Sequence, residues 1–275
     1  MSKVWSYEGK RVVVSGGGGA GMGAAAVTEL ADLGAEIHVL DLKEPPVKVA
    51  SYQAADLRDP DAVAAAIDTI GGRIDALFNA AGLPGPPFSD VDTMLVNFAA
   101  PRHLAACCLP HMPEGGAVCS ISSTAGAGYL MNIQKWLPLV ATADFAEAKA
   151  WIESHPEEIA TGYSPSKEAL IIWTMYAAVD FAKHGVRVNC ISPGPTDTPM
   201  MPDFEKMAGA ELIDMFARGA GRRSTPAEQG NAMIFLNSPA ASYISGENLV
   251  TDGGTLGAMT TGRLTFEMPA MPAGG

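Results

Sequence analysis

A glycine-rich loop between a strand and a helix is the feature that most restricts the fold of this chain. Residues 11–15 form an apolar, β-branched run, and residues 16–23 contain six glycines. A helix is predicted from about residue 21 to residue 33, ending before a glycine suited to a left-handed cap. A second apolar run follows at 36–40. This order predicts parallel strands joined by a helical crossover.

Similar apolar runs recur along the rest of the chain and alternate with alanine-rich helical stretches. The further predicted strands are residues 74–79, 117–122, 187–191 and 248–251. No internal repeat and no Ser- or Pro-rich linker divides the 275 residues. We therefore predict a single α/β domain whose doubly wound parallel sheet carries helices on both faces.

Composition and charge exclude several classes of protein. With 48% hydrophobic residues the chain can bury one large core, and its net charge of −12 argues against nucleic acid or an anionic membrane as a partner. No apolar run approaches the roughly 20 residues that span a bilayer. The N-terminus lacks the apolar region of a secretory signal, so we expect a cytoplasmic protein.

The cysteines and histidines form no ligand pattern. No CxxC or Cys/His spacing occurs, and the cysteines lie in stretches predicted to be buried, so we interpret them as reduced core residues. They are Cys107, Cys108, Cys119 and Cys190, and the scattered histidines are His103, His111, His155 and His184. We predict no catalytic metal.

The glycine loop favours a bound dinucleotide. Without side chains the backbone can approach a pyrophosphate, and the free amides and dipole at the helix N-terminus attract its negative charge. A glycine run alone is a weak signal, but this one follows a strand and opens a helix. The candidate contacts in the loop are Ser15, Gly16, Gly17, Gly21, Met22 and Gly23.

Carboxylates after the next strands extend the predicted nucleotide site. Asp41 ends the second strand, where it can accept hydrogen bonds from ribose hydroxyls and repel a 2′-phosphate, so NAD is favoured over NADP. Lys43 is interpreted as a solvated charge. Asp56 either binds the adenine amino group or caps the helix that begins near Pro60, a role that Asp59 fits better. Small residues after another strand let a cofactor lie against backbone: Asn79, Ala80, Ala81 and Gly82.

Tyr163 and Lys167 are the candidate catalytic pair. They stand four apart, so on a helix the phenol and the ammonium share a face and the cation favours the phenolate. A serine pair, Ser122 and Ser123, lies forty residues earlier. Because Ser123 lacks a Gly-x-Ser-x-Gly elbow and a His partner, we reject a hydrolase.

Residues 9–257 resemble the short-chain dehydrogenase/reductase family. The motifs that carry the resemblance are the loop at 16–23, the segment at 79–82, Asn97, Ser123, the Tyr163/Lys167 pair, Pro193-Gly194 with Thr198, and Asp252-Gly253-Gly254. The Ser15-Gly16 start of the loop, an insertion at 128–162 and the ending around 246–254 are most similar to bacterial NAD-dependent 3α-hydroxysteroid dehydrogenase/carbonyl reductases. The resemblance implies a Rossmann-type domain with about seven strands.

The resemblance also implies the chemistry of the site. Tyr163 exchanges a proton with an alcohol or ketone while hydride passes between carbon and nicotinamide C4, and Ser123 binds the substrate oxygen. Lys167, with the nicotinamide ring, lowers the pKa of the phenol. Asn97 marks a helix kink satisfied by a water, which also relays protons to Lys167. The remaining implied cofactor contacts are Leu42, Leu57, Pro193, Gly194, Thr196 and Thr198, beside Tyr163 and Lys167.

Three segments lie outside the common pattern. The insertion at 128–162 either walls the substrate cleft, covers an oligomer surface or is a passive surface elaboration. Residues 198–223 are interpreted as a Met-rich lid, and residues 258–275 as a C-terminal tail. The pliable lid suits a bulky hydrophobic secondary alcohol such as a hydroxysteroid. Smaller aryl, terpenoid or aliphatic secondary alcohols are the alternative, and a non-catalytic NAD-binding regulatory protein is the reading from another class.

The family resemblance implies a homodimer or homotetramer. Relatives associate through the helices that hold Asn97 and Tyr163 and through residues 228–250. An insertion at 128–162 would block the first of these surfaces, so we predict a dimer. Light scattering checks this, and a tetrameric mass would contradict it.

Overall fold

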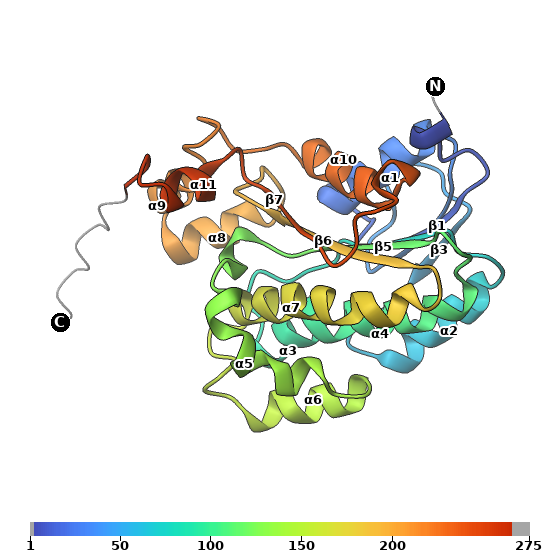
Figure 1. Cartoon of the computed structure of the whole chain (residues 1–275), viewed down its shortest axis with the longest axis horizontal. Coiled ribbons are helices and arrows are strands. Elements are labelled where there is room, and N and C mark those ends of the chain that lie inside the picture. Colours follow the sequence, from blue (N-terminus) through green and yellow to red (C-terminus); the bar gives the residue numbers. More distant parts are fainter. Residues whose placement is uncertain (1–2, 266–275) are drawn as a thin grey trace.

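A seven-stranded parallel sheet forms the centre of the molecule (Figure 1). The computed structural model describes residues 3–265. Its strand order is β3-β2-β1-β4-β5-β6-β7, which confirms the predicted Rossmann-type fold. The strands are β1 (Arg11–Ser15), β2 (Glu36–Asp41), β3 (Ser51–Ala54), β4 (Ala76–Asn79), β5 (Ala117–Ile121), β6 (Arg187–Pro193) and β7 (Asn248–Thr251).

Helices cover both faces of the sheet, and two more form an outer layer. On one face lie α1 (Met22–Asp32) and α10 (Pro226–Asn237); on the other lie α2 (Pro60–Ile70), α3 (Asp90–Met94), α4 (Ala100–Cys108) and α7 (Tyr163–Ala182). The outer layer is α5 (Tyr129–Val140) and α6 (Phe145–Ser154). The remaining helices are α8 (Met201–Ala208), α9 (Ala210–Met215) and α11 (Thr255–Thr260), with short turns η1 (Lys3–Trp5), η2 (Leu95–Ala99), η3 (Leu109–His111), η4 (Thr124–Gly126) and η5 (Pro239–Ala241).

Two hydrophobic clusters hold the layers together, one on each face of the sheet. Successive strand residues point to opposite faces, so Val13 joins the cluster under α4 and α7, whereas Val12 and Val14 join the cluster under α1 and α10. All three valines are fully buried. A Cβ on Gly230 of α10 would lie 3.0 Å from the amide nitrogen of Ala26 in α1. Small residues therefore let these helices approach closely.

The strand β3 was missed by the sequence analysis. It is an edge strand that pairs only with β2, and its four residues are partly or fully exposed. Because an edge strand is not buried on both faces, it lacks the continuous apolar run that marked the other strands. The predicted starts and ends of the others shift by at most two residues.

The insertion at 128–162 is a packed part of the domain. Glu168 of α7 accepts hydrogen bonds from the indole of Trp136 (2.6 Å) and the amide of Asn132 (2.9 and 3.0 Å). At the other end of α5, the buried guanidinium of Arg102 donates to the hydroxyl (2.9 Å) and carbonyl (2.6 Å) of Thr142. The insertion is therefore tied to α4 and to the N-terminal half of α7.

The C-terminal half of α7 stays open. Its side chains Met175, Tyr176 and Val179 are exposed.

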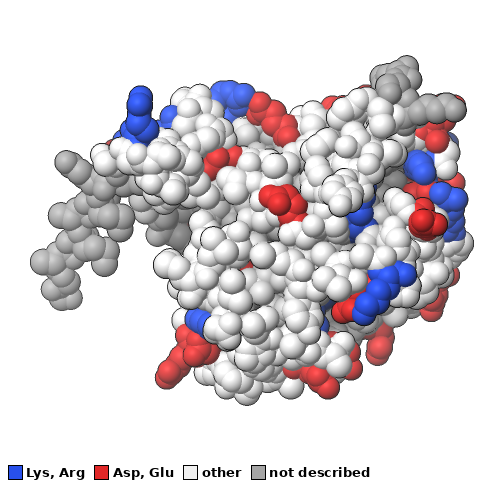
Figure 2. All heavy atoms as spheres, in the orientation of Figure 1, with Lys and Arg blue, Asp and Glu red and all other residues white. Residues whose placement is uncertain are grey.

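Figure 2 shows charged side chains scattered over one face of the molecule, with a broad area without Lys, Arg, Asp or Glu near its middle. Among residues 3–265, no helix is both long and apolar enough to cross a membrane.

The first residues of the predicted tail at 258–275 are helical. Residues 258–260 belong to α11, whose turn is organised by Asp252: its carboxylate accepts from the amides of Gly254 (2.9 Å) and Leu256 (2.7 Å). This contact is a physical reason for the Asp-Gly-Gly ending. The part of the predicted tail at 266–275 lies outside the described residues.

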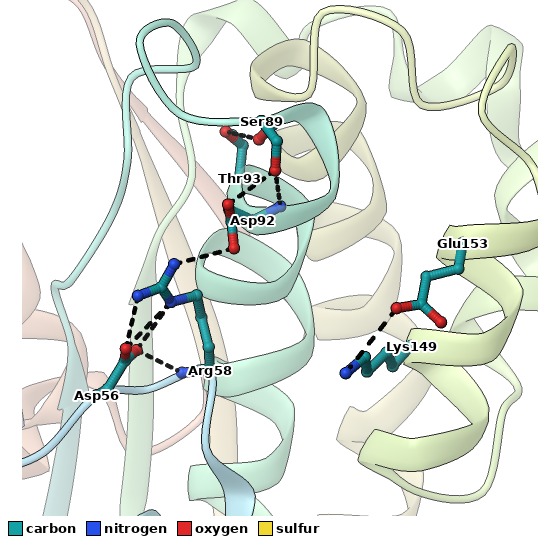
Figure 3. Close-up of polar contacts among 7 residues, drawn as sticks. All are labelled: Asp56, Arg58, Ser89, Asp92, Thr93, Lys149 and Glu153. Carbon is teal, nitrogen blue, oxygen red and sulfur yellow. Dashed lines mark hydrogen bonds and ion pairs between the residues drawn. The ribbon is translucent and has the colours of Figure 1, made fainter.

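Glu168→Ala tests how firmly the insertion is anchored. Removing the carboxylate leaves the Trp136 indole and the Asn132 amide without their acceptor, so the free energy of unfolding should fall by about 3 kcal/mol. Urea denaturation measures this. Glu153→Ala is the matched control, because Glu153 forms only an exposed 3.9 Å pair with Lys149 (Figure 3) and should change stability by about 0.5 kcal/mol or less. Equal losses in both variants would contradict the anchor.

Candidate active site

Two adjoining cavities lie at the carboxyl ends of the strands. The larger, of about 390 Å³, is bordered by the glycine loop and by the residues that follow β2, β3 and β4. The smaller, of about 220 Å³, is bordered by Ser123, Tyr163, the end of β6 and the segment at 198–216. Met22, Thr198 and Met200 border both. A molecule that fills the larger cavity therefore reaches the edge of the smaller one.

Tyr163 occupies the first turn of α7 and borders the smaller cavity. The helix begins after Thr161 and Gly162, which have φ angles of 78° and 58°. Burial raises the pKa of the Tyr163 phenol, and a hydrogen bond with Ser123 lowers it. The net direction is upward, so the protein groups alone do not produce the lowered pKa that we predicted for the phenol.

Lys167 lies beneath the tyrosine, one turn along α7. Its ammonium donates to the carbonyl of Ile121 at 2.8 Å and stands 5.4 Å from the centroid of the Tyr163 ring. Burial lowers the pKa of Lys167 to about 8. At neutral pH the ammonium therefore still carries its charge, and that charge favours the phenolate.

The two serines after β5 have different partners. The Ser122 hydroxyl donates to the carbonyl of Lys167 at 2.9 Å. The Ser123 hydroxyl accepts from the amide of Ala125 at 3.1 Å and is the hydrogen-bond partner of the Tyr163 phenol. Both residues border the smaller cavity, but only the Ser123 hydroxyl is directed at the phenol.

Asn97 lies in the π-helical turn η2, which accounts for the predicted kink. Its side chain is satisfied by protein groups: Oδ1 accepts from the amide of Leu83 (2.8 Å), and Nδ2 donates to the carbonyl of Leu83 (3.0 Å) and to Ser166 (3.1 Å). The Asn97 side chain thus has protein partners for both its oxygen and its nitrogen. A Cβ on Gly82 would lie 3.3 Å from Asn97 Oδ1 and 3.9 Å from Lys167 Nζ. The water relay stays a prediction.

The glycine loop has the shape that a dinucleotide requires. A Cβ on Gly18 would lie 2.0 Å from the carbonyl oxygen of Lys43, and one on Gly16 would lie 2.3 Å from the amide of Ala81. The helix α1 starts after Gly21 without a side-chain cap, so its first amides remain available at the cavity. Only glycine permits this backbone path, and the chemistry of the cavity fits a pyrophosphate.

Asp41 hydrogen-bonds the glycine loop and also borders the larger cavity. Its carboxylate accepts from the amides of Gly18 (2.8 Å) and Lys43 (2.9 Å). Each carboxylate oxygen accepts more than one hydrogen bond, so Asp41 retains acceptor capacity for hydroxyl groups. The side chain of Lys43 is exposed, as the sequence predicted.

The adenine end contains an ion-pair network that the sequence analysis missed (Figure 3). Arg58 donates to Asp56 (2.7–3.1 Å) and to Asp92 (3.0 Å). Arg58 holds the pKa of the Asp56 carboxyl below its usual value. Asp59 caps α2 by accepting from the amides at 61 and 62, so the capping interpretation of Asp56 is wrong. The two-residue spacing of Asp56 and Arg58 was the available signal.

The cavities gather most of the predicted cofactor residues. Bordering the larger are Gly16, Gly21, Met22, Gly23, Asp41, Leu42, Asp56, Leu57, Ala80, Ala81, Gly82 and Thr198, and bordering the smaller are Tyr163, Pro193, Gly194 and Thr196. Neither cavity is bordered by the other predicted residues, which are Ser15, Gly17, Asn79, Asn97 and Lys167. The sequence analysis missed Gly18, Gly19, Arg58, Phe88, Pro199 and Met200 at the larger cavity. Phe88 carried no sequence signal.

The predicted lid covers the smaller cavity with apolar side chains. Met200, Met201, Phe204, Ile213 and Phe216 line it. The Phe204 ring meets the Tyr163 ring edge-on, with centroids 4.9 Å apart. No residue of the insertion at 128–162 borders this cavity. The role of the insertion stays a prediction.

Metal ligation has no candidate in the described part of the chain. Within residues 3–265, no group of three His, Cys, Asp or Glu side chains is placed to hold an ion. The four cysteines are free thiols, and three are buried. The sequence analysis did not discuss His38. This residue is buried in β2, and its ring Nδ1 forms a 2.7 Å hydrogen bond with the hydroxyl of Ser51 in the edge strand β3.

Known proteins match this chain over most of its length. Residues 10–134 match the family model of short chain dehydrogenases, and residues 150–255 match that of enoyl-(acyl carrier protein) reductases. The coniferyl-alcohol dehydrogenase of Pseudomonas sp. (strain HR199 / DSM 7063) is 31% identical over 249 residues, 89% of this chain and 96% of that protein. The 3-alpha-hydroxysteroid dehydrogenase/carbonyl reductase of Comamonas testosteroni is 31% identical over 248 residues, 88% and 95% of the two chains.

A solved structure agrees with these matches. The 3-alpha-hydroxysteroid dehydrogenase from Pseudomonas sp. B-0831, complexed with NADH, superposes with a TM-score of 0.75 at 28% identity, covering 93% of this chain and all of that one. The chain therefore belongs to the short-chain dehydrogenase/reductase family and is an oxidoreductase. The resemblance to bacterial 3α-hydroxysteroid dehydrogenase/carbonyl reductases is confirmed.

Ser123→Ala tests the contact that lowers the pKa of the phenol. Loss of the hydrogen bond removes stabilisation of the charged phenolate, so the pKa of Tyr163 should rise. A pH titration of tyrosinate absorbance, corrected with a Tyr163→Phe variant, measures the shift. Thr69→Ala is the control and should leave the titration unchanged, since its hydroxyl is bonded to the Ala65 carbonyl within α2, away from the cavity. A downward or absent shift in Ser123→Ala would contradict the assignment.

Proposed function

We propose that the protein is an NAD-dependent dehydrogenase that interconverts a hydrophobic ring-containing secondary alcohol and its ketone. The observation that carries the proposal is the apolar cavity over Tyr163 and Ser123, which opens beside the glycine-lined cavity. A hydroxyl placed in the smaller cavity meets both the phenol and the serine.

Tyr163 acts as the acid/base in this proposal. In oxidation the phenolate accepts the hydroxyl proton of the substrate, and in reduction the phenol returns it. Ser123 donates to the same substrate oxygen, and the charge of Lys167 favours the phenolate from below. NAD supplies the hydride acceptor when it is bound. The phenol needs a pKa far below its ordinary value of about 10 to work near neutral pH, so the bound cofactor's positive charge must add to that of Lys167.

The charges around the larger cavity support NAD rather than NADP. Asp41 places a carboxylate at the end of β2, where it would repel a 2′-phosphate. Arg58 is the nearest alternative partner for such a phosphate, but Asp56 and Asp92 already compensate its charge. Lys43 is the remaining cation at the border of this cavity, and its side chain is solvent-exposed.

Two substrate classes follow from different observations. The likeness to 3α-hydroxysteroid dehydrogenases and the pliable Met-rich lid support a hydroxysteroid or a similarly bulky ring alcohol. The size of the cavity supports a smaller aryl alcohol, because about 220 Å³ lies below the roughly 300–1,000 Å³ of sites for drug-sized ligands. The likeness to a coniferyl-alcohol dehydrogenase agrees with this second class. A steroid would require the lid to lie further from Tyr163.

Turnover of a matched panel tests the proposal. NADH or NADPH formation is measured by absorbance with hydroxysteroids and with small aryl and aliphatic secondary alcohols. We expect NAD-dependent turnover of ring alcohols, and Tyr163→Phe should still bind NADH while its kcat falls at least about a hundredfold, as for loss of an acid/base group. Activity retained in Tyr163→Phe would contradict the catalytic assignment. NADH binding without turnover of any alcohol would favour a non-catalytic NAD-binding regulatory protein.

A further inference from the structure

The lid segment starts and ends at one small bridge next to the smaller cavity. Thr196 and Ser224 form an isolated parallel bridge. The amide of Asp197 donates to the carbonyl of Ser224 (2.9 Å), and the amide of Ser224 donates to the carbonyl of Pro195 (2.9 Å). The two ends of the lid are therefore fixed, while α8 and α9 project from this base.

Arg223, the last residue before the bridge closes, contacts every part of the lid. Its Nη1 is 2.7 Å from Glu205 in α8 and 3.7 Å from Asp197 at the lid's base, and its Nε is 2.6 Å from Asp214 in α9. The Arg223 side chain is only 18% exposed. One cation thus joins the base of the lid to both of its helices.

The lid has little internal support for its position. Helices α8 and α9 have eight and six residues and are separated by Gly209, which has a φ of 82°. Helices this short are marginal by themselves. The same two helices carry Phe204 and Ile213, which line the smaller cavity. Wherever the helices lie, they set the distance between these side chains and Tyr163.

We propose that Arg223 is a positioning residue that latches α8 and α9 over the substrate cavity and thereby sets its size. The kinetic part of this inference rests on the proposed function. An arginine suits the task because its planar fork can bond Glu205 and Asp214 in different directions at once, which a lysine ammonium does less well. Isolated exposed ion pairs contribute little, but here one partly buried cation serves three carboxylates on three segments.

Hydrogen exchange tests the latch without any substrate. In Arg223→Met, the amides of residues 201–216 should exchange about tenfold faster, equivalent to about 1.4 kcal/mol. Arg222→Met is the matched control: it removes the same charge from the neighbouring residue, whose partner is Glu228 at the start of α10 rather than the lid. It should leave exchange in the lid as in the wild type. Unchanged lid exchange in Arg223→Met would overturn the proposal.

Steady-state kinetics test the consequence for the substrate. Arg223→Met should raise the substrate KM about tenfold and change kcat by less, because the lid encloses the substrate while Tyr163 and Ser123 stay in place. The wild-type KM should rise with ionic strength, since salt screens exposed carboxylates, and the variant should have lost this dependence. Arg223→Lys should restore part of the KM. A fall in kcat with KM unchanged in Arg223→Met would overturn the proposal.

The two arms separate failure of the latch from failure of the proposed function. If no alcohol is turned over but lid exchange rises in Arg223→Met, the latch stands and the substrate assignment fails. If Arg223→Met loses its global thermal stability, Glu205→Gln and Asp214→Asn replace it. Each removes one contact and leaves the arginine, and each should speed exchange in its own helix. No change in either would overturn the proposal.

Discussion

Two hydrogen bonds between the end of β5 and the first turns of α7 are the contact on which the site depends. Ser122 donates to the carbonyl of Lys167, and the Lys167 ammonium donates to the carbonyl of Ile121. A Cβ on Gly126 would come within 2.9 Å of the Lys167 backbone, so the turn η4 that follows the strand packs directly against the helix. This contact sets where Tyr163 and Ser123 meet, and the remaining parts of the structure bring cofactor and substrate to that point.

Lys167 is a buried cation next to the buried phenol of Tyr163, and this burial is energetically unfavourable for charge. Burial works against the charged forms of both Lys167 and Tyr163, raising the pKa of the phenol and lowering that of the ammonium. A resting phenol in such a place is a weak base. In the proposed function, the positive charge of a bound cofactor stabilises the phenolate, so cofactor binding favours the form of Tyr163 that accepts a proton.

The parts that surround the carboxyl ends of the strands differ in how firmly they are held. The glycine loop is held by a hydrogen bond to Asp41, and glycines at 16 and 18 let its backbone pack directly against the backbone of neighbouring segments. The insertion is equally fixed through Glu168 and Arg102. The lid, by contrast, meets the core through apolar side chains and through the ion pairs of Arg223. In the proposed function, substrate choice depends on the lid, which is the part of the site with the weakest internal support.

Local patterns in the sequence were sufficient for most of the fold and for the centre of the site. Apolar runs predicted six of the strands, and five of these are interior strands that are buried on both faces and must be apolar throughout. The edge strand β7 was found because it still carries Leu249 and Val250 side by side. The edge strand β3 escaped, since its exposed face carries no such run. Tyr163, Lys167 and the glycine loop were found because their spacing reflects one helical turn or one strand-to-helix junction.

What the sequence by itself determined is therefore the class of chemistry: a parallel α/β sheet, a glycine-lined nucleotide edge and a Tyr/Lys pair. Only the tertiary structure decided which distant residues meet. Glu168 with Trp136, Phe204 with Tyr163 and Arg223 with Glu205 are partners whose contacts have no fixed spacing along the chain. Periodicity reports neighbours within one element, whereas these contacts depend on how separate elements pack against each other.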